Sequence, residues 1–207
     1  MNIAVIGAAG RTGRLVVLEA ARRRHYVTAL VRNPEHLGGI AQVIERVVHG
    51  DGADIDSVAD VLSGQDAVVV AVSSRGAKVP VGASVAAAVV EASAAAGVTR
   101  MIFTSTYGMV ATRPLVVAGL LKRLLARPFE EQRRADDIVA ASNADWTILR
   151  ATRLTDHPGT GLVRVSSDPL LTGPFSLTRA DLAQQLVDLV EHPIGIRTIL
   201  NMTGERR

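Results

Sequence analysis

A glycine-rich segment near the amino terminus has the residue types and spacing to bind a diphosphate. The segment Gly7–Gly13 reads GAAGRTG, follows the β-branched run Ile3–Ile6 and leads into an amphipathic stretch that predicts a helix. Gly7 permits a tight turn, Gly10 leaves room for a phosphate, and Gly13 lets the helix pack on the strand, while the free N–H groups of the first helical turn favour an anion. The alternative is a structural turn without a ligand. The loop residues expected to bind a dinucleotide are Gly7, Ala9, Gly10, Arg11, Thr12 and Gly13.

Two arginines lie where they could distinguish NADP(H) from NAD(H). The second predicted strand ends at Val31 and is followed by Arg32, where NAD-specific folds usually place an acidic residue about 20 residues beyond the loop. The guanidinium of Arg32 would offer a planar, permanently charged group to a 2′-phosphate, and Arg11 could approach the same phosphate from the loop. We therefore predict NADP(H). The alternative is that both arginines are solvated surface residues.

The remainder of the chain alternates between β-branched runs and helical stretches, which is typical of repeated βαβ units. Predicted strands cover Ile3–Ile6, Val27–Val31, Val43–Val48, Ala67–Val72, Met101–Ser105, Trp146–Leu149, Leu162–Ser166 and Arg197–Met202. Predicted helices cover Gly13–Arg24, Ile55–Leu62, Val81–Ala96, Phe129–Ser142 and Arg179–Glu191, with Asp54 or Asp56 and Gly97 as caps. The pattern predicts an α/β fold of Rossmann type, with a doubly wound, mostly parallel sheet flanked by helices in one domain over residues 1–207. Because ligands bind at the carboxyl ends of such strands, Ser73 should line the cofactor site.

Composition excludes several classes of protein. The chain has no cysteine, so it has no thiol nucleophile or thiolate metal site, and its five histidines lack the spacing of a metal site. The formal charge of +3 comes from dispersed arginines, which gives no indication of nucleic-acid binding. The sequence shows neither a signal peptide nor a run long enough to span a membrane. We expect a cytoplasmic protein without a metal, acting as a monomer or small homo-oligomer.

The proton relay of typical short-chain dehydrogenases is absent from the sequence. That relay uses Tyr-x-x-x-Lys, in which the ammonium lowers the pKa of the phenol. The two tyrosines, Tyr26 and Tyr107, have no lysine four residues later, and Gln132 stands about where many relatives have that lysine. Any hydride transfer must therefore proceed without this pair.

Over most of its length the chain resembles the biliverdin reductase B (flavin reductase) family and its atypical short-chain dehydrogenase/reductase relatives. The segments that carry the resemblance are Gly7–Gly13, Leu30–Arg32, Gly50–Asp51, Gly64–Val70, Thr104–Thr106, Ala144–Arg150 and Gly159–Gly161. The resemblance implies that NADPH passes hydride directly to a flavin or tetrapyrrole, so that a tyrosine acid is not essential. It also implies that Asp51 approaches the adenine amino group, although Asp51 could simply cap the next turn.

The family's active-site residues can be carried over to two places. Its serine after the fifth strand falls at Thr106, or at Ser105 if the register shifts by one, and strand-end capping is the alternative role for Thr106. Its histidine after the sixth strand falls at Arg153, which cannot titrate as an acid but could bind a substrate anion or be a surface charge. This departure argues against biliverdin and favours a flavin or quinone. His157 could supply the missing acid, although a loop histidine is more often solvated.

The substrate-side elements are expected mainly from residues 106–128 and 151–178. The first of these ranges contains an amphipathic stretch over residues 113–127, which could cover the substrate or simply pack on the domain. The sequence therefore predicts an NADPH-dependent reductase of a planar acceptor. The alternative is a non-catalytic NADP(H) sensor that binds a protein partner. An epimerase or dehydratase is disfavoured, because such enzymes use Tyr-x-x-x-Lys and a longer carboxyl-terminal domain.

Overall fold

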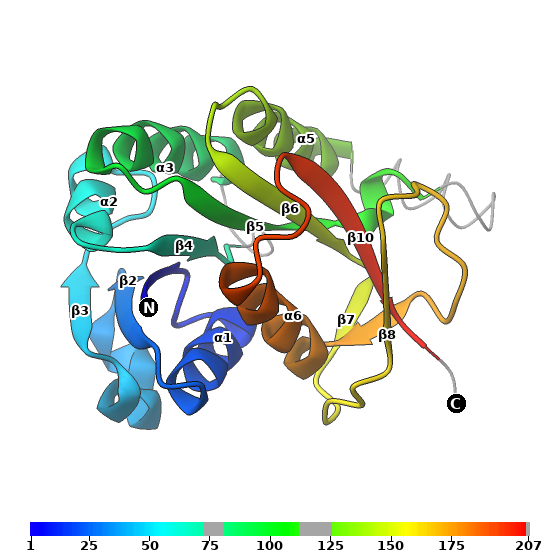
Figure 1. The fold of residues 1–207 in the computed structure, drawn as a ribbon, viewed down its shortest axis with the longest axis horizontal. Helices are drawn as coiled ribbons and strands as arrows, with labels where there is room; N and C mark the ends of the chain where they lie inside the picture. The colour runs from blue at the N-terminus through cyan, green and yellow to red at the C-terminus, as the bar shows by residue number, and fades with distance from the viewer. Residues whose placement is uncertain (73–80, 112–125, 206–207) are drawn as a thin grey trace.

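The computed structural model describes residues 1–72, 81–111 and 126–205, and it shows an α/β domain built on an eight-stranded sheet (Figure 1). The strand order is β3-β2-β1-β4-β5-β6-β10-β8, and every neighbouring pair is parallel except β10 with β8. The strands are β1 (Asn2–Ile6), β2 (Tyr26–Val31), β3 (Arg46–His49), β4 (Ala67–Val70), β5 (Arg100–Thr106), β6 (Asp145–Ala151), β8 (Val163–Ser166) and β10 (Thr198–Gly204). The predicted α/β fold class with a mostly parallel, doubly wound sheet is confirmed.

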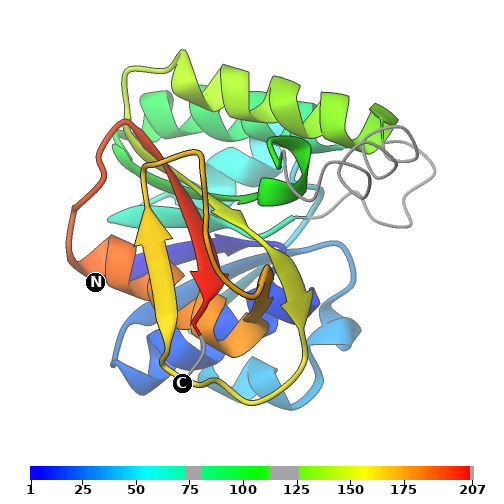
Figure 2. The same cartoon turned by 90° about the vertical axis from the view of Figure 1, so that its right-hand side faces the viewer.

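Helices cover both faces of the sheet, as Figures 1 and 2 show. The described helices are α1 (Arg11–Arg22), α2 (Ile55–Leu62), α3 (Gly82–Ala96), α5 (Ala126–Ala140) and α6 (Arg179–Glu191). One face packs against α1 and α6, with Ile3, Val5 and Leu186 in its core. The other packs against α2, α3 and α5, with Ile6 and Val89 in its core. Because β1 and β4 are covered on both sides, β4 and all of β1 after Asn2 are apolar and buried, as expected for central parallel strands.

Local capping explains where several helices begin and end. The carboxylate of Asp54 accepts a hydrogen bond from the Ser57 amide at 3.0 Å, so Asp54, not Asp56, is the N-cap of α2. Helix α3 ends at Gly97, whose φ of +72° is the left-handed conformation predicted for a helix-terminating glycine. Thr178 caps α6 by accepting from the Asp181 amide at 3.0 Å.

Some predicted boundaries were wrong. The third strand was expected to begin at Val43 but begins at Arg46, because residues Pro34–Val43 form 3-10 turns interrupted at Gly38. A separate two-stranded parallel sheet, formed by β7 (Arg153–Thr155) and β9 (Ser176–Thr178), was not predicted. Strands of three residues are too short to show a periodic pattern. In Figure 2, β8 runs opposite to β10, which places the antiparallel strand at one edge of the main sheet.

Among the described residues, the structure contains no helix that combines the length and the apolar character needed to cross a membrane.

Candidate functional site

The glycine loop connects β1 to α1 at the carboxyl edge of the sheet. The Gly10 amide donates to the Gly7 carbonyl at 2.9 Å, and the Arg14 amide donates to the Gly10 carbonyl at 2.9 Å, which closes the turn. Gly10 is the N-cap of α1 and is extended, and it has no side chain to occupy the amides of the first helical turn. Those amides are therefore available to an anion, as the sequence predicts.

Two of the three glycines are required by the packing of the chain itself. A Cβ on Gly13 would lie 2.1 Å from the Gly7 carbonyl oxygen, and a Cβ on Gly7, whose φ is +90°, would lie 2.7 Å from the Ala71 carbonyl oxygen. A Cβ on Gly10 meets a milder contact, 3.1 Å from the Gly7 oxygen. Packing therefore restricts the side chain at position 10 less than at positions 7 and 13. The better explanation for glycine at position 10 is that it leaves room for a ligand.

The loop lies at the point where the strand order reverses. Strand β1 pairs with β2 on one side and with β4 on the other, and the helices that follow β1 and β4 cover opposite faces. In open α/β sheets this switch point is where ligands bind. Ala9 is fixed at this point by Arg14, whose Nε donates to the Ala9 carbonyl at 3.2 Å and whose Nη1 donates to the Leu37 carbonyl at 2.9 Å. Thr12 lies half-buried in the first turn of α1.

The two arginines expected at the 2′-phosphate have different surroundings. Arg32 is exposed directly after β2, and its guanidinium has no hydrogen-bond partner among the described residues. Arg11 instead forms an exposed ion pair, Nη1 to the Asp156 carboxylate at 3.2 Å, and Asp156 also pairs with Arg179 at 2.6 Å. The structure therefore pairs Arg11 with the segment that follows β7.

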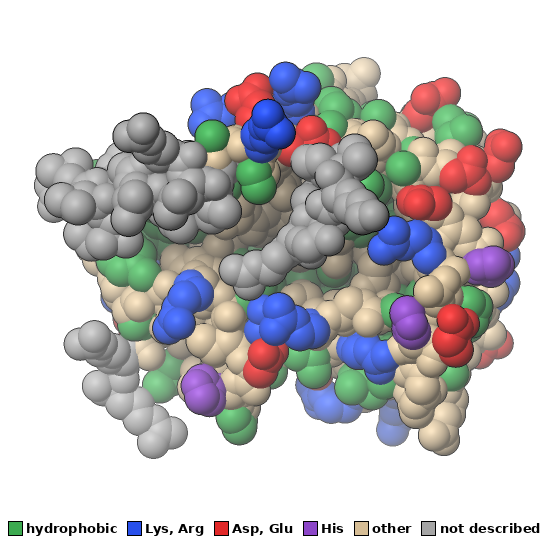
Figure 3. All heavy atoms as spheres, turned by 180° about the vertical axis from the view of Figure 1, so that it is seen from behind, with side chains coloured by type: hydrophobic (Ala, Val, Ile, Leu, Met, Phe, Trp, Pro, Cys, Tyr) green, Lys and Arg blue, Asp and Glu red, His purple; other side chains and the backbone are tan. Residues whose placement is uncertain are grey.

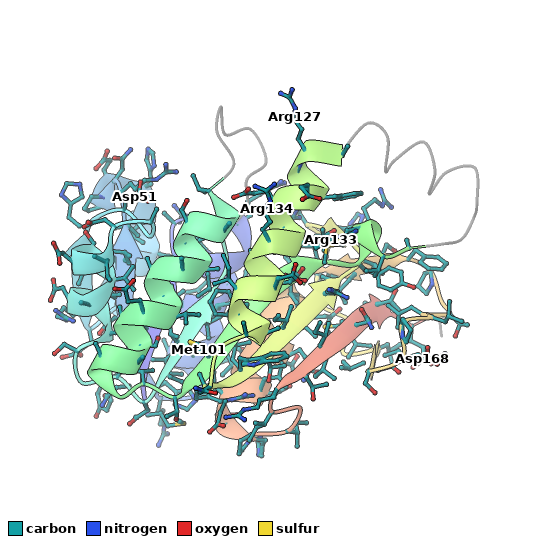
Figure 4. The ribbon with its side chains drawn as sticks, turned by 90° about the horizontal axis from the view of Figure 1, so that it is seen from above. Asp51, Met101, Arg127, Arg133, Arg134 and Asp168 are labelled. Atoms are coloured by element: carbon teal, nitrogen blue, oxygen red, sulfur yellow. The ribbon has the colours of Figure 1, made fainter. Side chains whose placement is uncertain are left out.

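The remaining cofactor candidates are Asp51 and Ser73. Asp51 is exposed after β3, and its Oδ1 accepts from the Ala53 amide at 3.0 Å, so it does cap the following turn. In Figure 4, Asp51 and Asp168 lie at opposite ends of the molecule. Ser73 lies outside the described residues, as does most of the amphipathic stretch over residues 113–127.

A buried carboxylate gathers polar groups at the carboxyl ends of β5 and β6. Asp136 on α5 is 3% exposed, and its Oδ2 accepts from Ser105 Oγ at 3.0 Å and from Arg150 Nε and Nη2 at 3.1 and 3.0 Å. Its Oδ1 accepts from Gln132 Nε2 at 3.2 Å. We name these four residues, Ser105, Gln132, Asp136 and Arg150, the Asp136 cluster.

Burial and hydrogen bonding act in opposite directions on Asp136. Burial is the largest effect and raises the pKa of the Asp136 carboxyl above its ordinary value, whereas hydrogen bonds from Gln132, Arg150 and Ser105 lower it. Four N–H or O–H donors point at the two oxygens, which is the environment of an ionised carboxylate. Ser105 therefore has its proton directed at Asp136, and its oxygen lone pairs remain available to accept a hydrogen bond.

The other candidate catalytic residues are placed differently from Ser105. The Thr106 hydroxyl accepts from the Gly108 amide at 3.3 Å, which is the capping role considered as its alternative. Arg153 is exposed on β7, in the small sheet, and does not join the Asp136 cluster. His157 is also exposed, two residues after β7 ends.

Tyr107 is buried and its hydroxyl is fully engaged. It donates to the Pro169 carbonyl at 2.8 Å, accepts from the Leu171 amide at 3.1 Å, and its ring stacks on Phe175. Tyr107 therefore supports the loop before β9 and has no hydrogen available for a substrate.

Sequence reasoning missed Gln132, Asp136 and Arg150 as site residues. A signal was present, because Gln132 and Asp136 are four residues apart and share a helix face with the apolar Ala135 and Val139. Polar residues on a buried face need partners. The partners, however, come from strands that only the tertiary structure places beneath α5.

Charges are mixed on the face in Figure 3, where basic and acidic side chains are interspersed. Such a surface differs from the continuous basic patch of a nucleic-acid-binding protein. Among the described residues, no group of three or more His, Asp and Glu side chains could hold a metal ion.

Comparisons with known proteins agree with this geometry. The YhfK protein of Bacillus subtilis, whose name describes an uncharacterized sugar epimerase, is 30% identical over 194 residues, covering 90% of this chain and 86% of YhfK. The structure of ChuY, an anaerobillin reductase from Escherichia coli O157:H7, has a TM-score of 0.85 at 21% identity and covers 99% of this chain and 97% of ChuY. A short-chain dehydrogenase/reductase from Veillonella parvula, solved with NADP, has a TM-score of 0.81 at 19% identity and covers 99% of this chain and 94% of that chain.

The two solved structures confirm the fold expected from the resemblance to short-chain reductases. A family model described as NAD(P)H-binding matches residues 7–193, from the first glycine of the loop to the residues just beyond α6. The glycine loop and the open amino end of α1 fit that cofactor class. The chain belongs to the NAD(P)H-binding family.

Proposed function

We propose that the chain is an NADPH-dependent reductase that transfers hydride directly to a planar acceptor of the flavin or quinone type. The observation that carries the proposal is that the glycine loop and the Asp136 cluster share one edge of the sheet. The loop follows β1, the cluster lies at the ends of β5 and β6, and only β4 separates β1 from β5. With neighbouring strands about 4.8 Å apart, the two sites are roughly 10 Å from each other.

The two ends of this edge have complementary roles in the proposal. The amides of α1 would hold the diphosphate, and the exposed guanidinium of Arg32 would hold the 2′-phosphate that distinguishes NADPH from NADH. When bound, NADPH supplies a hydride. At the other end, the Ser105 oxygen would accept a hydrogen bond from the nicotinamide carboxamide or the acceptor. None of these roles needs a tyrosine acid.

The name of YhfK suggests a sugar epimerase, and we do not extend that name to this chain. The sequence has no Tyr-x-x-x-Lys pair, and the Tyr107 hydroxyl is occupied by backbone groups. ChuY is described as an anaerobillin reductase. Arg153, where the resemblance expects a histidine, argues against biliverdin in particular.

Stopped-flow measurement of NADPH oxidation tests the proposal with flavin mononucleotide, riboflavin and menadione as acceptors. We expect turnover with at least one of them, and slower turnover with NADH than with NADPH. Failure of all three acceptors, with NADPH binding intact, would contradict the reductase proposal.

A second candidate is the NADP(H) sensor, and one observation favours it. The hydroxyls of Ser105 and Tyr107 donate within the chain, to Asp136 and to the Pro169 carbonyl, which leaves few groups among the described residues to donate a proton to an acceptor. A sensor would bind both NADP⁺ and NADPH, transfer no hydride from NADPH to any acceptor, and bind its protein partner with an affinity that depends on the oxidation state of the cofactor.

A further inference from the structure

We infer that Arg150 binds an anionic group on the acceptor, and that Asp136 is the positioning residue that aims it. The inference rests on the proposed function and names a substrate class for the same site: planar acceptors that carry a phosphate or a carboxylate.

The first step is the geometry of the guanidinium. Arg150 donates to Asp136 through Nε and Nη2, and both bonds end on the same oxygen, Oδ2. Nη1 has no hydrogen-bond partner among the described residues. A guanidinium fixed along one edge presents its remaining N–H groups in a set direction, with less rotamer freedom left to lose when a ligand binds.

The second step is exposure. The Arg150 side chain is 16% exposed, whereas that of Asp136 is 4% exposed. The carboxylate is therefore covered by its donors, and the accessible part of the pair belongs to the cation. An incoming anion would meet Arg150 and not Asp136.

The third step is position in the sheet. Arg150 lies one residue before the end of β6, directly opposite Ser105 on β5 in the parallel register. Since both donate to the same oxygen, their polar groups must lie close together. The ligand-facing pair is thus a hydrogen-bond acceptor, Ser105 Oγ, beside a cationic donor, Arg150 Nη1.

The fourth step is the cost of the ion pair. A buried charge pair gains little over apolar packing, because both ions lose their hydration. Helix α5 already packs through Ala135 and Val139, which belong to the apolar core. The pair is therefore better explained by orientation of Arg150 than by attachment of α5. Figure 4 shows α5 beside α3 above the sheet, with Arg127 at the start of α5 directed away from the body of the molecule.

Flavin mononucleotide and riboflavin provide the test, because they share one ring system and differ only in a phosphate. For the wild type we expect KM and Kd for flavin mononucleotide to be lower than for riboflavin by about tenfold, as expected for a charged hydrogen bond. Arg150→Met should remove that difference by weakening flavin mononucleotide binding, with riboflavin and NADPH binding changed less than about twofold. Asp136→Asn should act in the same direction, and Asp136→Glu should restore part of the effect.

The matched control is Arg46→Met. Arg46 also pairs with a helix aspartate, Asp60, at 2.9 Å, but it lies at the amino end of β3, which is an outermost strand of the sheet and is separated from β6 by four strands. This variant should leave both flavins unchanged.

Three results would overturn the inference: equal affinity of the wild type for the two flavins, an equal loss for both in Arg150→Met, or an equal loss for both in Asp136→Asn. The wild-type comparison needs no variant and stands even if Arg150→Met does not fold. If neither flavin nor menadione is reduced, the proposed function is contradicted, and Kd values from flavin fluorescence still decide the role of Arg150.

Discussion

Gly13 packs directly against Gly7: a Cβ on Gly13 would lie 2.1 Å from the Gly7 carbonyl oxygen. The turn after β1 and the first turn of α1 are therefore in direct backbone contact. This contact fixes the first helical amides at the end of β1. Packing of the chain thus requires glycine at Gly7 and Gly13, whereas glycine at Gly10 is better explained by the room that it leaves for a ligand.

This difference between the glycines predicts different outcomes for two alanine variants. Gly13→Ala should lower the free energy of unfolding by about 2 kcal/mol or more, because the loop must move away from α1. Gly10→Ala should leave Tm within a few degrees of the wild type and still weaken NADPH binding. Thermal melts and calorimetric titrations with NADPH would measure both. Unchanged NADPH affinity in Gly10→Ala would contradict the assignment of this loop to the diphosphate.

Arg32 should determine the choice between the two cofactors. Its guanidinium is exposed and has no partner in the described part of the chain, so Arg32→Ala should not change Tm. The variant should raise the Kd for NADPH by about tenfold or more, since a charged hydrogen bond to the phosphate is lost, and leave the Kd for NADH nearly unchanged. Equal effects on the two cofactors would show that Arg32 is only a surface charge.

Tyr107 should contribute to stability and not to proton transfer. Tyr107→Phe removes the hydroxyl that bonds to Pro169 and Leu171, and we expect a loss of about 1 kcal/mol in the free energy of unfolding. The rate of NADPH oxidation per folded molecule should stay within about twofold of the wild type. A fall of several hundredfold in that rate, with Tm unchanged, would restore tyrosine as the acid.

Glu19 should make stability depend on acid pH. Its carboxylate lies between Arg22 and Arg23, whose hydrogen bonds and charges lower its pKa to about 2 from an ordinary value of 4.5. A lowered pKa in the folded state stabilises the protein above the unfolded value, and this contribution disappears as pH falls from about 4.5 towards 2.

Denaturant unfolding of the wild type and of Glu19→Gln across this pH range measures the effect. The wild type should be more stable near neutral pH by about 2 kcal/mol, and the difference should shrink towards the acid end. A difference that does not change with pH would mean that Glu19 acts through packing alone.

The sequence alone was enough to predict the features that depend on neighbours along the chain. The glycine loop could be recognised because it directly follows the run Ile3–Ile6 and directly precedes a helix. The helix α2 and its capping by an aspartate, and the end of α3 at Gly97, were predicted for the same reason. Period and caps within about ten residues are enough to identify such elements.

Only the tertiary structure decided which polar groups meet. Ser105 and Asp136 are 31 residues apart, and Arg11 and Asp156 are 145 residues apart, so no local pattern could pair them. The parallel register of β5 with β6 sets Ser105 opposite Arg150, and α5 brings Asp136 to both. A side chain's type shows what it can bond to, but strand order and helix packing determine which partner it finds, because burial forces each polar group to pair with whatever the fold brings near it.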